Sequence, residues 1–145
     1  CPFKNNCKKK KDDNMATEIE VTFPENLKVE AKINDHVLTT DQPKKSGGDG
    51  SGPSPFELFT ASIATCAGYF ALKFCRTRDL ETAGMRLRMS YEWDKEQKRY
   101  PAMAIELELP EHFPEKYRGA IIKAMNQCVV KQHIHQPPEF EMTVI

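Results

Sequence analysis

Apolar and polar residues alternate along several short stretches of the chain, which is typical of strands with one buried face. We expect strands at residues 19–23, 27–33, 36–39, 85–93, 103–109 and 139–145. The first two are joined by a short turn and form a hairpin with one apolar and one polar face. In the fourth and fifth, Arg86 and Arg88 are expected to face Glu106 and Glu108 across an antiparallel pair.

The first helix is predicted by a capping box. Ser54 is the N-cap, Pro55 takes the first helical position, and Glu57 reaches back to the cap N–H. The pattern continues to about residue 76 or 78 and leaves little polar face, so we expect this helix to be buried nearly all round.

A second helix is expected to start near Pro114 and to end before Pro137. Its apolar stripe consists of Tyr117, Ile121, Ala124, Met125 and Cys128. The order βββ-α-ββ-α-β predicts an α+β domain, with an antiparallel sheet packed on two helices. Because one chain supplies too little cover for the first helix, we expect a homodimer.

The charge is balanced over 145 residues, with 21 Lys and Arg against 21 Asp and Glu. This balance gives no electrostatic reason to bind nucleic acid or an anionic membrane. Residues 1–14 carry a net charge of +3, which leaves −3 for residues 15–145. We interpret residues 1–14 as a disordered basic tail and expect Met15 to begin the domain, which spans residues 15–145.

The sequence predicts a cytoplasmic protein without a membrane span. No segment has the pattern of a signal peptide. The most apolar stretch, residues 56–72, contains Glu57 and is shorter than the ~20 apolar residues that a span needs. Five cysteines are also too few for a secreted disulfide framework.

Two motifs resemble binding sites but have simpler interpretations. The glycine-rich segment 46–53 lacks the lysine of a phosphate-binding loop, so we expect a flexible loop.

His133 and His135, two apart in an extended segment, share one face and form a possible metal site with Cys128. Because such histidine pairs are usually free of ligand and no further ligands lie close by, we expect no metal.

The cysteines are the main candidates for chemistry. Cys66 and Cys75 lie nine positions apart on the first helix and point to opposite faces, so they cannot pair. Cys75 is most simply a packed apolar residue. Cys66 lies among small residues, and Cys128 interrupts an aliphatic stripe. From the residues alone, each is more often an inert core cysteine than a catalyst.

The segment from Gly52 to Cys66, GPSPFELFTASIATC, resembles the cysteine signature of the OsmC/Ohr family. Cys128-Val129-Val130 is similar to the second cysteine motif of that family. The separation of the cysteines and the order of elements also match, so the resemblance covers residues 17–145.

The resemblance implies an intertwined homodimer with cofactor-free thiol chemistry at its interface. Cys66 would attack the O–O bond of an organic hydroperoxide and become a sulfenic acid. Cys128 would condense with it to a disulfide, which a dithiol donor then reduces. The apolar substrate pocket is expected to contain Phe56, Glu57, Phe59, Tyr69 and Phe70, with Trp93 nearby.

Two departures from the hydroperoxide reductases place the chain closer to the YhfA-like branch. No Arg precedes Arg76, and Phe56 stands ten residues before Cys66, where the reductases have Glu. The cations expected to stabilise the Cys66 thiolate are Lys28, Lys32 and Arg118. The alternative is a non-catalytic module of the same fold that binds a hydrophobic or sulfur-containing small molecule.

Overall fold

The computed structural model describes residues 17–145. It forms two units, one ending at Ser54 and the other spanning Pro55–Ile145. The predictions for the basic tail of residues 1–14 and for a start at Met15 lie outside the described residues.

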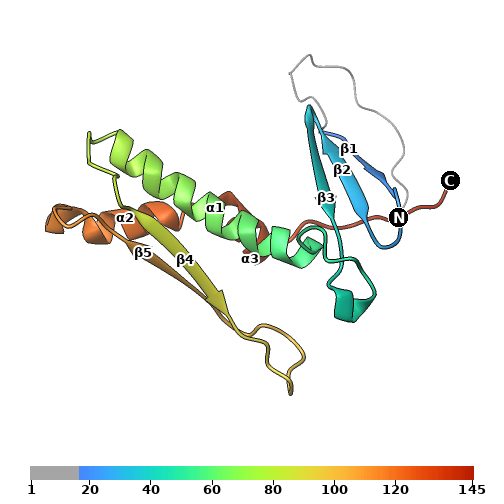
Figure 1. Cartoon of the computed structure of the whole chain (residues 1–145). Coiled ribbons are helices and arrows are strands. Elements are labelled where there is room, and N and C mark those ends of the chain that lie inside the picture. The colour runs from blue at the N-terminus through green and yellow to red at the C-terminus, as the bar shows by residue number, and fades with distance from the viewer. Residues whose placement is uncertain (1–16) are drawn as a thin grey trace, which may run out of the picture. The chain divides into compact units, whose positions relative to one another are not determined.

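The N-terminal unit is a three-stranded antiparallel sheet in the order β1-β2-β3 (Figure 1). Its strands are β1 (Ile19–Thr22), β2 (Val29–Ile33) and β3 (His36–Thr40). Val21 pairs with Ala31, which pairs with Leu38, so the apolar positions of all three strands share one face. The predicted hairpin with one apolar face is therefore confirmed. In the single chain Ile19 remains 53% exposed and Val21 46%.

The glycine-rich loop after β3 is organised by one buried carboxylate. Asp41 is 1% exposed and accepts hydrogen bonds from the backbone N–H groups of Gln42 (2.7 Å), Asp49 (3.1 Å) and Ser51 (2.9 Å), and from the Ser51 hydroxyl (2.8 Å). A short 3-10 turn, η1 (Lys44–Ser46), lies within the loop. The loop expected for residues 46–53 is present, and the hydrogen bonds to this carboxylate hold its backbone at Asp49 and Ser51.

The C-terminal unit contains the long helix α1 (Pro55–Arg76) and the antiparallel hairpin of β4 (Arg86–Tyr91) and β5 (Met103–Glu108). α1 begins at Pro55, as the capping box predicts. The predicted pairing of β4 with β5 is confirmed, with Arg86 opposite Glu108 and Arg88 opposite Glu106. Arg88 also forms a diagonal ion pair with Glu108 at 2.9 Å.

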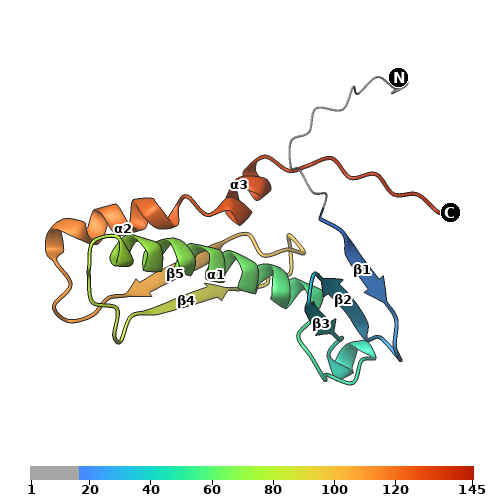
Figure 2. The same ribbon diagram turned by 90° about the horizontal axis from the view of Figure 1, so that it is seen from above.

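The second helical region follows β5 and packs beside α1 (Figure 2). It consists of η2 (Glu115–Tyr117), α2 (Arg118–Met125) and α3 (Val129–His135). The prediction of one continuous helix is wrong here, because Cys128 leaves the helical region with φ −52° and ψ 113°. Cys128 thereby becomes the N-cap of α3, and its sulfur accepts the N–H of Lys131.

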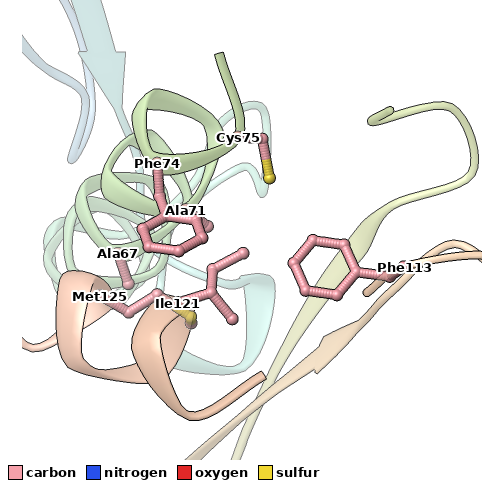
Figure 3. Packing of buried hydrophobic residues seen from close by; sticks show 7 residues of the cluster. All are labelled: Ala67, Ala71, Phe74, Cys75, Phe113, Ile121 and Met125. Carbon is pink, nitrogen blue, oxygen red and sulfur yellow. The ribbon is translucent and has the colours of Figure 1, made fainter. Parts of the chain in front are cut away.

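The core of this unit lies between α1, α2 and the segment before η2 (Figure 3). It consists of Ala67, Ala71, Phe74, Cys75, Phe113, Ile121 and Met125. The interpretation of Cys75 as a packed apolar residue is confirmed. In the single chain Phe59 (39%) and Tyr69 (56%) are exposed on the other faces of α1. This agrees with the expectation that one chain supplies too little cover for this helix, and its burial nearly all round stays a prediction for the homodimer.

The last predicted strand is absent. Residues 139–145 pair with no strand in the described part of the chain and continue beyond α3 without regular structure (Figure 2). Phe140, Met142 and Val144 alternate with polar residues but are more than four-fifths exposed. The alternating pattern is present, but a strand also needs a hydrogen-bonded neighbour. Residues 17–145 of this single chain supply no such neighbour for it.

Within residues 17–145, α1 is the one helix that is long and apolar enough to cross a membrane. The same length and composition are found in core helices of soluble proteins. α1 has this role here, since it packs against α2, α3 and β4.

Candidate functional site

Two of the three described cysteines meet where α1 passes the start of α3. Cys66 lies in the middle of α1 and is half-buried, whereas Cys128 is fully buried. The Cys128 thiol donates to the carbonyl oxygen of Ile63, one turn before Cys66 on α1, at 3.9 Å. It is also within hydrogen-bonding reach of the Cys66 sulfur. The structure therefore brings together the two cysteines that the sequence singled out.

The first three N–H groups of α3 are shared between the two sulfurs. Val129 and Val130 donate to Cys66, and Lys131 donates to Cys128 at 3.5 Å. These groups have no partner inside a helix, and here the cysteines supply acceptors for them. The break in the helix at Cys128 thus points three backbone donors at the thiol pair.

The surroundings of the two sulfurs shift their pKa values in opposite directions. Burial raises the pKa of Cys66, but hydrogen bonds from Val130, Cys128 and Val129 and the positive charge of Lys131 outweigh it, so that the pKa is lowered overall. Burial raises the pKa of Cys128, and the hydrogen bond to Cys66 raises it further. Deprotonation of the pair therefore favours a thiolate at Cys66 beside a thiol at Cys128.

The cation that acts on Cys66 is Lys131, which sequence reasoning missed. Its ammonium Nζ is held by the side-chain oxygen of Asn126 at 2.9 Å. The sequence indicates Lys131 only if Cys128 is known to be the N-cap of α3, because Lys131 is then the third residue of that helix and lies in its first turn.

The three cations expected from the sequence have other close partners or belong to the other unit. Arg118 pairs with Glu115 at 2.6 Å. Lys28 and Lys32 lie in the N-terminal unit, where Lys28 contacts Glu25 at 2.6 Å.

The predicted pocket residues fall into two groups along α1. Phe56 and Phe59, near the helix start, join Tyr91, Trp93 and Tyr100. Tyr100 is the centre of this cluster, with ring centroids 4.9 Å from Phe56, 5.0 Å from Tyr91 and 5.1 Å from Trp93. The sequence pattern does not identify Tyr91 and Tyr100 as members, because the alternation marks Tyr91 only as a strand position and Tyr100 lies in a polar loop without periodicity.

The second group lies next to Cys66. Tyr69 and Phe70 pack edge to face at 5.2 Å, and they follow Cys66 by three and four positions, which places them on its side of the helix. Phe56 precedes Cys66 by ten positions, about 15 Å along the helix axis. Glu57 is exposed in the first turn of α1. The predicted pocket residues therefore form two groups along α1, and Tyr69 and Phe70 are the two that lie beside Cys66.

The histidine pair lies on α3 instead of an extended segment. Residues two apart on a helix point to nearly opposite sides, so the premise that His133 and His135 share a face is wrong. His133 Nδ1 contacts the carbonyl oxygen of Val129 at 2.9 Å. Residues 17–145 contain no cluster of three His, Cys, Asp or Glu side chains arranged to hold a metal ion.

The fold and the sulfur pair define an α+β protein in which a half-buried cysteine with a lowered pKa adjoins a buried cysteine with a raised pKa. Residues 48–143 match the model of the OsmC family, described as OsmC-like protein. The chain belongs to this family, and the matched segment contains both Cys66 and Cys128. Among curated proteins, none matches the sequence of this chain.

Solved structures share the fold at low sequence identity. An osmotic stress induced and detoxification response protein from Psychrobacter arcticus 273-4 has a TM-score of 0.71 at 21% identity, covering 86% of this chain and 92% of its own. An OsmC-like protein from Mycoplasma pneumoniae has a TM-score of 0.68 at 12% identity, covering 86% and 90%. The organic hydroperoxide resistance protein OsmC from Legionella pneumophila has a TM-score of 0.55 at 15% identity, covering 85% and 91%.

Proposed function

We propose that this protein is a cysteine-based redox protein that reduces organic hydroperoxides, with Cys66 as the attacking thiolate and Cys128 as the resolving thiol. One observation carries this proposal: the two sulfurs adjoin, and their surroundings lower the pKa of Cys66 while raising that of Cys128. A thiolate is the nucleophilic form of cysteine, so this distribution of charge suits attack by Cys66.

The reaction balances with the residues at the site and one external reductant. The Cys66 thiolate attacks the distal oxygen of the hydroperoxide, the O–O bond breaks, and a proton converts the departing alkoxide to an alcohol. Cys66 becomes a sulfenic acid. The Cys128 sulfur then displaces its hydroxyl, which leaves as water, and a disulfide forms. A dithiol reductant regenerates both thiols by exchange and is itself oxidised to a disulfide.

The groups around Cys66 have distinct roles in this scheme. The thiolate is stabilised by the N–H groups of Val129 and Val130 and by the charge of Lys131. Cys66 is only half-buried, so a substrate can reach its sulfur. The exposed ring of Tyr69 lies on the same side of α1 and offers an apolar approach for the organic part of the substrate. These surroundings favour an alkyl or aryl hydroperoxide over hydrogen peroxide.

We further propose that the protein acts as a cytoplasmic homodimer. The apolar face of the N-terminal sheet and the C-terminal residues Phe140 and Val144 are exposed in the single chain. A second copy of the chain is the simplest source of the missing cover, and of a neighbour for the strand expected at residues 139–145.

The proposal is tested by following consumption of cumene hydroperoxide and of hydrogen peroxide in the presence of a dithiol. Wild type and Cys75→Ser are expected to turn over, with a preference for cumene hydroperoxide. Cys66→Ser is expected to be inactive, and Cys128→Ser to react once and stop. Equal activity in Cys66→Ser and wild type would refute the proposal.

A further inference from the structure

The break between α2 and α3 is bridged by a side-chain contact. Asn126 is the C-cap of α2, and its side-chain oxygen accepts a hydrogen bond from the Lys131 ammonium at 2.9 Å. The two residues flank Cys128, which is the N-cap of α3. The contact therefore joins the end of one helix to the first turn of the next, around the residue that breaks the helix.

The backbone on which Asn126 lies is fixed. Its own N–H donates to the carbonyl oxygen of Ile122 at 3.1 Å, and the N–H of Cys128 donates to that of Met125 at 3.3 Å. The lysine side chain has a flexible four-carbon stem, so its ammonium has no fixed position unless an acceptor selects one. The amide of Asn126 is such an acceptor on a fixed backbone.

This contact orients the ammonium without neutralising it. The amide oxygen carries no net charge, and within residues 17–145 no carboxylate forms an ion pair with Lys131. A carboxylate at the position of Asn126 would pair with the ammonium and cancel most of its field. The neutral acceptor leaves the full positive charge to act on the Cys66 sulfur.

Lys131 is the cation among the groups that act most strongly on Cys66. The other groups are the backbone N–H groups of Val130 and Val129 and the thiol of Cys128. Cys128 is therefore the titratable neighbour of Cys66, and Lys131 is the charged one.

Further charged side chains on the elements packed against α1 have other positions. On α2, Arg118 pairs with Glu115 at 2.6 Å, and Lys123 is exposed. On α3, the His133 ring contacts a backbone carbonyl oxygen at 2.9 Å. The arginines of β4 alternate with the residues of that strand that pack on the core, and so lie on its outer face. On α1 itself, Lys73 is about two helical turns from Cys66.

We propose that Asn126 is the residue that positions Lys131 for Cys66, by orienting its ammonium through a neutral acceptor. Asn126 acts through Lys131, so it is a positioning residue. This role rests on the proposed function, in which Cys66 is the attacking thiolate. It concerns the reactivity of the Cys66 sulfur, however, and is measured without a peroxide.

The test is the pH profile of Cys66 alkylation by iodoacetamide in the full chain, with peptide mass spectrometry to assign each cysteine. Asn126→Asp keeps the size of the side chain and adds a negative charge, so the profile should move to higher pH by about half a unit or more. Asn126→Ala releases the ammonium and should cause a smaller shift in the same direction. Asn126 has φ −72° and ψ −10°, which either substitute adopts without strain.

Gln127→Glu is the matched control, because it adds the same charge one residue further along, on an exposed side chain. It should leave the profile close to that of wild type. In a Lys131→Gln background, Asn126→Ala should cause no further shift, since the group it positions is gone.

Wild-type profiles in both Asn126 variants would overturn the proposal, as would an equal shift in Gln127→Glu or a full further shift in the Lys131→Gln background. Failure of the proposed function has a different result. The alkylation profiles would then shift as expected while none of the proteins consumes cumene hydroperoxide.

Discussion

Lys131 contacts Cys128 through its backbone and acts on Cys66 through its side chain. Its N–H donates to the Cys128 sulfur at 3.5 Å, while its ammonium charge lowers the pKa of Cys66. One residue therefore supports both members of the sulfur pair, the buried thiol by a hydrogen bond and the half-buried thiol by charge.

Replacing Lys131 by Gln should make Cys66 a weaker acid. Removal of a positive charge disfavours the thiolate, so the pKa of Cys66 rises and less of it is ionised at neutral pH. Alkylation of Cys66 by iodoacetamide, followed by peptide mass spectrometry across a pH series, should show a profile displaced to higher pH. Lys123→Gln provides the control with the same loss of charge on an exposed position. Coincident profiles for Lys131→Gln and wild type would contradict this role.

Replacing Asp41 by Asn should reduce stability and remove part of its dependence on pH. Hydrogen bonds from Ser51, Gln42 and Asp49 hold the pKa of Asp41 below its usual value. A lowered pKa in the folded state gives stability that is present above the unfolded value of about 4 and is lost as the pH falls through the folded value. Thermal unfolding of Asp41→Asn should therefore show a lower midpoint at pH 7 and a flatter decline below pH 4. An unchanged midpoint would show that the carboxylate is dispensable.

Two glycine substitutions should act in opposite directions. A Cβ at Gly48 would lie 2.0 Å from the carbonyl oxygen of Gln42, so Gly48→Ala must displace backbone and should destabilise by about 1–3 kcal/mol. A Cβ at Gly119 meets nothing within 4 Å inside α2, and Gly119→Ala should stabilise by about 0.5–1 kcal/mol. Denaturant unfolding measures both. Similar changes in the two variants would contradict the predicted packing of the loop.

Tyr100 should anchor the aromatic cluster at the start of α1. Tyr100→Ala removes its ring contacts with Phe56, Tyr91 and Trp93, and the free energy of unfolding should fall by about 1–3 kcal/mol. Trp93 is the single tryptophan, so its emission should shift to the red as its neighbour is lost. Tyr100→Phe keeps the ring and serves as the control. An unchanged emission spectrum in Tyr100→Ala would be evidence against the cluster.

Local patterns were sufficient to predict most elements of the fold. The alternation around Val21 and Leu107 and the capping box at Ser54 gave the strands and the start of α1 correctly, because these signals depend on neighbouring residues. The strand expected around Met142 failed for the opposite reason. Strand formation depends on a hydrogen-bonded neighbour, which the sequence pattern alone does not supply.

The site was predictable only in part. The resemblance selected Cys66 and Cys128, which adjoin in the structure. Lys131 was missed because the break at Cys128 has no Gly or Pro to mark it, and the pattern of the surrounding residues continues as a helix.

Mapping of disulfides after one equivalent of cumene hydroperoxide is the most direct test of the proposed pairing of Cys66 with Cys128. The reduced protein is treated, alkylated and digested, so that each cysteine is assigned separately. One new disulfide is expected, between Cys66 and Cys128, with Cys75 still alkylated as a free thiol. Retention of both thiols, or a disulfide that joins either of them to a different cysteine, would contradict it.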